Sequence, residues 1–287
     1  MSENVQKTLR DSAALRWLAL ILLAGAMFCS YIFMDILSPI KDLMWDTKGW
    51  DSTAFGTMQG SETFLNVFVF FLIFAGIILD KMGVRFTAIL SGAVMLVGAS
   101  INWYALTDMF AGSNLEVWFN EHLNYIPGFD ELGVSPFYKG MPASAKFSAI
   151  GFMIFGCGVE MAGITVSRGI VKWFKGREMA LAMGSEMALA RLGVATCMIF
   201  SPMFARLGGE VSVSRSVAFG VVLLMIALIM FIVYAFMDKK LDSQTGEAEE
   251  KDDPFKLSDL GKILTDSGFW LVALLCVLYY SAIFPFQ

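Results

Sequence analysis

Five ionisable residues interrupt long apolar stretches of this 287-residue sequence, and they are the first candidates for chemistry. They are Asp35, Glu62, Glu160, Glu186 and Arg191. If these stretches cross a bilayer, each charge costs roughly 2.5–3.5 kcal/mol at the membrane centre, so such a residue usually faces a cavity or a partner. Carboxylates and a guanidinium can hold the two ends of a zwitterion, and a buried carboxylate can carry a proton.

Glu160 and Arg191 occupy matching positions in a predicted helical hairpin. Glu160 precedes Lys175, near the centre of the turn, by 15 residues, and Arg191 follows it by 16. At about 1.5 Å of helix rise per residue, the two side chains would lie at nearly the same depth. They could face each other and separate to hold a zwitterion, or form a permanent salt bridge that orients the hairpin.

The other ionisable residues are less informative. Asp35 and Glu62 flank the turn between the first two apolar runs and either line a vestibule or lie near the interface. Glu186 lies five residues before Arg191, on another helix face, and points toward a cleft or the inner interface. Arg168, near a helix end, is expected to extend toward lipid headgroups.

The composition is that of a membrane protein. Hydrophobic residues make up 57% and charged residues 16%, against about 45–50% and about 25% in soluble domains. The net charge of −5 excludes a basic nucleic-acid surface. The sequence has one histidine, His122, four cysteines without a CxxC spacing, and no HExxH or GxSxG motif. We therefore expect no enzyme, catalytic residue, metal site or cofactor.

Seven apolar runs are long enough, or nearly so, to span a bilayer. They are Ala14–Ile40, Thr53–Leu79, Phe86–Leu106, Ala143–Val171, Met179–Arg206, Val217–Met237 and 268–287. They predict an all-α membrane protein with a six-helix bundle over 1–238, interrupted by an external insertion at about 107–142. An acidic cytoplasmic linker with an amphipathic helix follows over 239–267. Residues 268–287 would begin a seventh helix, which we expect to be truncated.

Lys and Arg are concentrated in the segments that are inside if the N-terminus is cytoplasmic. The insertion is interpreted as an interfacial cap rich in aromatic residues, with a substrate lid as the alternative. An N-terminal acidic-dileucine pattern is missing, which favours a plasma or bacterial inner membrane over a lysosomal one.

The turn between the second and third runs combines Gly76, Asp80, Lys81, Gly83 and Arg85. Its spacing resembles the signature loop of the major facilitator superfamily. Gly83 would permit a positive φ, Gly76 a close helix approach, and Asp80 would accept hydrogen bonds at a helix N-terminus. The resemblance implies six helices of a major facilitator fold and a cytoplasmic gating loop; the alternative is an ordinary basic inner turn.

Several segments resemble one branch of that superfamily, the lysosomal dipeptide transporters. They are Phe155–Glu160, Lys172–Glu178, Met187–Gly193, Phe269–Leu271, Tyr279–Tyr280 and Phe284–Phe286.

This resemblance implies a transporter that works by alternating access, with Glu160 and Arg191 in the substrate cavity and a dipeptide as substrate. Asp35 and Glu186 are further candidates for substrate binding. The implied partners are the bilayer, a C-terminal half, protons as a coupling ion and an accessory subunit. Transport of another small organic anion and a non-transporting scaffold remain alternatives.

Overall fold

The computed structural model describes residues 8–245, 261 and 264–283, and these residues form helices and loops without a strand. The chain divides into two compact units, residues 1–249 and 250–287. The bounds of the helices are η1 Leu9–Asp11, α1 Ala13–Met34, η2 Ser38–Ile40, α2 Lys41–Lys48, α3 Ser52–Phe68, α4 Phe71–Ala105, α5 Asn114–His122, α6 Ala143–Phe174, α7 Met179–Ala205, α8 Val213–Thr245 and α10 Ser267–Ile283.

Within the described residues, five helical segments are long and apolar enough to cross a membrane. They are Ala13–Lys48, Phe71–Ala105, Ala143–Phe174, Met179–Ala205 and Val213–Gln244. The prediction of an all-α membrane protein is confirmed. In the second unit, α10 is an apolar helix in the run expected to begin a seventh span. The amphipathic helix predicted near 254–264 lies almost wholly outside the described residues.

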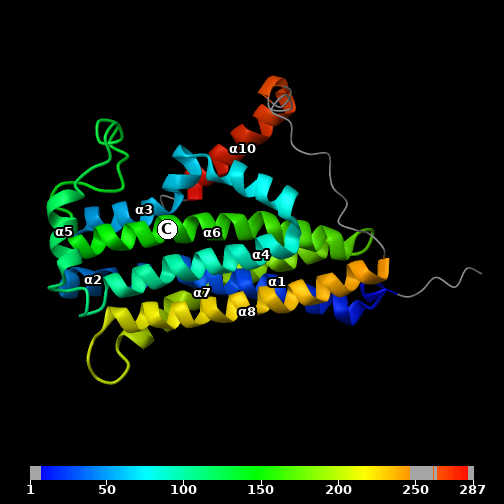
Figure 1. The fold of residues 1–287 in the computed structure, drawn as a ribbon, viewed down its shortest axis with the longest axis horizontal. Coiled ribbons are helices and arrows are strands. Elements are labelled where there is room, and N and C mark those ends of the chain that lie inside the picture. Colours follow the sequence, from blue (N-terminus) through cyan, green and yellow to red (C-terminus); the bar gives the residue numbers. More distant parts are fainter. Residues whose placement is uncertain (1–7, 246–260, 262–263, 284–287) are drawn as a thin grey trace, which may run out of the picture. The chain divides into compact units, whose positions relative to one another are not determined.

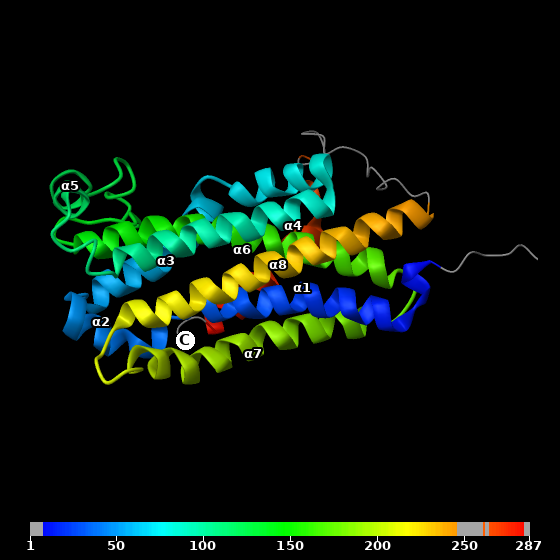
Figure 2. The same ribbon diagram turned by 60° about the horizontal axis from the view of Figure 1, so that its bottom comes forward.

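The first unit is a bundle in which α4 packs against α6 and α8, while α1 packs against α7 and α8. Figures 1 and 2 show these long helices running side by side. We call the end that holds η1, the α6–α7 turn and the end of α8 the amino-terminal end. The opposite end, with residues 106–142 and 206–212, is the loop end.

Glycines allow the closest helix contacts. A Cβ added to Gly98 of α4 would lie 2.4 Å from the Phe155 nitrogen, and one added to Gly151 would lie 2.6 Å from the Gly98 oxygen. Backbone therefore meets backbone between α4 and α6, as is common in membrane helix packing. Next to this contact, the buried rings of Phe33 and Phe155 have centroids 4.8 Å apart and fill the bundle core.

The second predicted span is not one continuous helix. α3 ends at Phe68, and Phe70 adopts the left-handed conformation with φ 54° before α4 begins at Phe71. Valine and phenylalanine surround the break, and β-branched and aromatic residues have weaker helix propensity than leucine or alanine. The expected continuity over 53–79 was therefore wrong. No glycine or proline marks this position in the sequence, which is why the break was not expected.

Two other elements differ from the predicted spans. α4 continues through Gly83, whose φ of 80° and ψ of 169° separate the second half of span two from span three. α8 runs past Met237 to Thr245, because its polar last turns meet charged partners on other helices, as described below.

The insertion at 107–142 contains the short helix α5 and is attached to α6 by a buried lysine. Lys146 is 1% exposed, and its Nζ donates to the Phe119 carbonyl and the Asn124 Oδ1, both at 3.1 Å. Aromatic packing supports the attachment: the Phe110 and Phe147 rings stack with centroids 5.3 Å apart. These contacts agree with a packed cap.

Candidate functional site

Arg191 lies beside α1 in the membrane-spanning part of the bundle. Its guanidinium carbon is 5.8 Å from the centroid of the Tyr31 ring, a cation–π arrangement. The approach is close because a Cβ added to Gly193 would lie 2.6 Å from the Phe28 oxygen. Asp35 follows Tyr31 by one helical turn and lies within electrostatic reach of Arg191. Arg191 and Asp35 therefore share one region between α1 and α7.

Glu62 and Glu160 form a second group between α3 and α6. A Cβ added to Gly156 of α6 would lie 2.0 Å from the backbone carbonyl oxygen of Glu62 and 2.9 Å from the Glu62 Cγ. The two helices therefore touch at this point. Glu160 lies one turn further along α6 and therefore on the same helix face. Glu62 is buried, whereas Glu160 is exposed on the surface of the chain, within electrostatic reach of Glu62.

Glu160 and Arg191 form no ion pair with each other within the described residues. α1 packs against both α6 and α7, so it separates the helices that the sequence placed next to each other. Arg191 consequently meets Tyr31 of α1. Arg191 lies within electrostatic reach of Asp35, and Asp35 within electrostatic reach of Glu62.

Glu186 is partly buried on α7, five residues before Arg191 and on a different helix face. Among the described residues, its carboxylate has neither a hydrogen bond nor an ion pair. The structure therefore places Arg191 with Asp35 in one group and Glu160 with Glu62 in another, and Glu186 lies outside both.

The signature loop lies within α4, and at the amino-terminal end its side chains contact the end of α8. Gly83 has the expected positive φ, and this kink is followed by Arg85, whose Nη1 lies 2.7 Å from the Asp242 Oδ2. The same nitrogen lies 3.9 Å from an oxygen of Asp238. Arg85 thus holds the loop to the last turns of α8.

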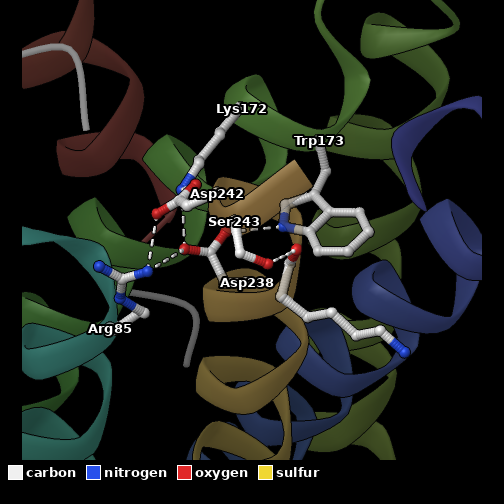
Figure 3. Close-up of polar contacts among 7 residues, drawn as sticks. Arg85, Lys172, Trp173, Asp238, Asp242 and Ser243 are labelled. Atoms are coloured by element: carbon white, nitrogen blue, oxygen red, sulfur yellow. Dashed lines mark hydrogen bonds and ion pairs between the residues drawn. The ribbon is translucent and has the colours of Figure 1, made fainter. Parts of the chain in front are cut away.

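α6 binds the same two aspartates (Figure 3). The Lys172 Nζ lies 2.7 Å from an oxygen of Asp238 and 2.7 Å from one of Asp242. The Trp173 indole Nε1 donates to the Asp238 Oδ1 at 3.0 Å. Asp238 is 0% exposed, and buried charges persist in proteins when they are paired and hydrogen-bonded. We call Arg85, Lys172, Trp173, Asp238 and Asp242 the charge network.

The other loop residues behave differently from the sequence predictions. Asp80 accepts from the Arg168 guanidinium at 2.6 Å, so its partner is a cation on α6 and not a row of helix N–H groups. Arg168 accordingly forms an ion pair where headgroup contact was expected. Lys81 is exposed. The close helix approach expected at Gly76 is absent from the described chain, since nothing lies within 4 Å of an added Cβ.

A further pair of contacts ties the start of the chain to the α6–α7 turn. Arg177 donates to Asp11 at 2.8 Å, and Arg16 lies 3.6 Å from the Glu178 carboxylate. The Thr8 backbone amide and hydroxyl, with the Arg177 guanidinium, hold the pKa of Asp11 below its ordinary value. All of these groups lie at the same end as the charge network.

The long apolar helices of this fold are those of a membrane protein. A model of the Major Facilitator Superfamily matches residues 23–286, and the chain belongs to that family. It is a multi-pass integral membrane protein of a transporter family.

The relatives found among curated proteins are called lysosomal dipeptide transporter MFSD1. The human protein is 24% identical over 280 residues, covering 94% of this chain and 52% of the relative. The zebrafish protein (Danio rerio) is 30% identical over 145 residues, and the chicken protein (Gallus gallus) 29% over 145 residues; these matches cover 48% of this chain and 31% and 32% of the relatives. The chain thus spans at most about half the length of these relatives. No solved structure matches.

Sequence reasoning missed the acidic half of the charge network. Asp238 and Asp242 are spaced by four residues immediately after an apolar run, which places them on one helix face. That spacing was a usable signal that the helix continues and presents two carboxylates to a partner. Lys172 and Trp173 were noticed only as part of a loop motif.

Proposed function

We propose that this chain forms the N-terminal bundle of a transporter that carries short peptides as zwitterions by alternating access. The observation that carries the proposal is the set of membrane-embedded charges of both signs. Arg191 and Glu160 are exposed on the bundle and have no ion pair among the described residues. An unpaired charge in the membrane is costly, so such residues usually serve a substrate or ion pathway.

The two charges suit the two ends of a dipeptide. Arg191 offers a planar guanidinium with several N–H donors for the peptide carboxylate. Glu160 offers an acceptor for the peptide ammonium, with Asp35 beside Arg191 as a further polar group. Because α1 lies between them, the bundle holds the two charges apart without any need to break a salt bridge first. The relatives named as dipeptide transporters support this substrate class.

The charge network and the Asp80–Arg168 pair are proposed to latch the amino-terminal end in one state of the cycle. They connect α4, α6 and α8 at the level of the signature loop. Release and re-formation of such pairs would let the helices rock relative to a second bundle.

The test is uptake of labelled alanyl-alanine by proteoliposomes that contain the full-length protein. Wild type should show saturable uptake, while Glu160→Gln and Arg191→Ala should each reduce it at least about tenfold, the effect of losing roughly 1.4 kcal/mol of binding. Glu131→Gln, at an exposed position in the insertion, is the matched control and should transport normally.

Three outcomes separate the alternatives. Uptake unchanged in both variants, with protein inserted and folded, would refute the binding role of the two charges. Competition by organic acids but not by dipeptides would favour an organic anion held by Arg191 alone. Failure to transport either class would support a non-transporting scaffold.

We further propose a cytoplasmic N-terminus, since among the described residues of the bundle the amino-terminal end carries more Lys and Arg than the loop end. Cysteines placed at exposed positions near Lys175 should react only with membrane-permeant thiol reagents in intact cells; labelling by impermeant reagents would reverse the assignment. A plasma or bacterial inner membrane is the location that the sequence favours, and fractionation of cells that produce a tagged protein tests it.

A further inference from the structure

Glu62 is a buried carboxylate that the proposed peptide site does not use. It is 9% exposed and lies within the second span, and no hydrogen bond or ion pair reaches its carboxylate from the described residues. Its Cγ lies next to Gly156, at the point of contact between α3 and α6. The side chain is therefore directed at the helix that carries Glu160.

Two amide side chains on the same face of α3 make this region polar. Gln59 and Asn66 lie three residues before and four residues after Glu62, which places all three on one helix face. Both amide atoms of Asn66, and the Gln59 Oε1, are buried without a hydrogen-bond partner in the described part of the chain. The Gln59 Nε2 does donate to the Met34 carbonyl at 3.1 Å. Buried polar atoms are nearly always satisfied, so the three unpartnered amide atoms beside an acid without a partner indicate a site that receives a polar ligand.

The charges around Glu62 are acidic on the elements that pack against it. α6 contributes Glu160, and Asp35 follows the end of α1. Arg191 of α7 is the nearby cation, but it lies over Tyr31 and within reach of Asp35.

α4 supplies no free cation at this level of the membrane, because its acidic and basic residues all belong to the signature loop. Arg85 is bound to Asp242, and Asp80 is bound to Arg168. Lys81 is exposed in the same loop. In the described part of the chain, Glu62 and Glu160 are thus two neighbouring carboxylates that no cation pairs with.

We propose that Glu62 and Glu160 form an acid pair that holds one proton in the empty transporter and releases it when the ammonium group of a peptide binds. Two neighbouring carboxylates in a poorly solvated site do not both ionise readily, because their charges repel, so the empty pair retains a proton. An arriving ammonium supplies the missing positive charge, and both acids can then ionise. The proton leaves to the solution on the side that is open, so total charge is conserved in the exchange.

This inference rests on the proposed function, because it assigns the proton that peptide binding would displace. It adds Glu62 to the site as a positioning and proton-holding residue. It also sets the sign of a pH effect. Protons and peptide ammonium compete for the pair, so peptide affinity rises with pH while the pair titrates, by up to about tenfold per pH unit.

The experiment measures proton release when alanyl-alanine binds to the full-length protein in detergent. Protein and dipeptide solutions are brought to the same pH in a weak buffer and mixed with an indicator dye. Displacement of a labelled dipeptide reports binding separately. Wild type should release up to about one proton per dipeptide bound. N-acetyl-alanyl-alanine, which lacks the ammonium, should release none.

At a dipeptide concentration that saturates each protein, Glu62→Gln should release almost no proton per alanyl-alanine bound, because Glu160 is the only acid of the pair that remains. Glu62→Asp should keep the release, and Glu131→Gln, an exposed acid in the insertion, should match wild type. Binding without proton release in wild type, or full release in Glu62→Gln, would overturn the acid pair while leaving the peptide site intact.

Absence of dipeptide binding would overturn both proposals. If Glu62→Gln does not fold, the pH series of wild type decides the question. A Kd that stays constant between about pH 5 and pH 8 contradicts competition between proton and ammonium.

Discussion

Replacing Gly156 by alanine is expected to force α3 and α6 apart at the position of Glu62. The new Cβ would lie 2.0 Å from the Glu62 oxygen and 2.8 Å from its carbonyl carbon, where ordinary contacts begin near 3.4 Å. Both opposing atoms belong to backbone, so a side-chain rotation cannot relieve the clash. The helices must separate locally by about 1 Å or more, and overpacking of this kind costs typically about 1–3 kcal/mol.

Because the clash is with backbone, we expect the upper end of that range for Gly156→Ala. At 2–4 °C per kcal/mol for a unit of this size, the Tm should fall by roughly 6–12 °C. The assay is thermal unfolding of the purified protein in detergent, followed by tryptophan fluorescence. Dipeptide uptake should fall as well, because the shift moves Glu62 away from Glu160.

Gly163→Ala is the matched control, because Gly163 lies on the same helix with nothing within 4 Å of an added Cβ. That substitution should leave the Tm unchanged or raise it slightly, since alanine is the better helix former. Equal Tm values for the two variants would refute the close contact between α3 and α6, and with it the placement of Glu62 against the face that carries Glu160.

Two further substitutions test the ends of the bundle. Asp238→Asn should lower the free energy of unfolding by about 3 kcal/mol, because Lys172 then faces a buried neutral amide in place of a carboxylate. Thermal unfolding measures this loss. Asp46→Asn, at an exposed position, is the control, and an equal or smaller loss in Asp238→Asn would contradict the network. Lys146→Met should loosen the insertion, because it removes the hydrogen bonds from the Lys146 Nζ to Phe119 and Asn124. Limited proteolysis should then cut residues 107–142 several times faster than in wild type. An unchanged cleavage rate would show that aromatic packing alone holds the cap.

The fold was predictable where hydrophobicity alone decides it. Apolar runs of sufficient length gave the spans because a bilayer demands internal hydrogen bonding along the whole segment. The break at Phe70 was not predictable, since Val69 and Phe70 carry no turn signal. The extension of α8 was missed for a related reason: Asp238 is stabilised by partners from other helices, and a hydropathy pattern contains no information about them.

The sequence predicts a depth for Glu160 and Arg191 but says nothing of their lateral position. Counting residues from a turn places Glu160 and Arg191 at one level, because helix rise is constant. It cannot tell which helix lies between them. That depends on how α1 packs, and the close approach of Gly193 to the Phe28 backbone is one of the contacts that bring α1 against α7. Glu62 was undervalued for the same reason, since its burial follows from a neighbour on α6.

The break between α3 and α4 constrains which side of the bundle can touch lipid. A helix end leaves several backbone N–H and C=O groups without intrahelical partners, and hydrocarbon offers them nothing to bind, at several kcal/mol for each unsatisfied group. The peptide units around Val69 and Phe70 must therefore face protein or water. This short segment therefore identifies the side of the bundle that does not contact the hydrocarbon of the bilayer.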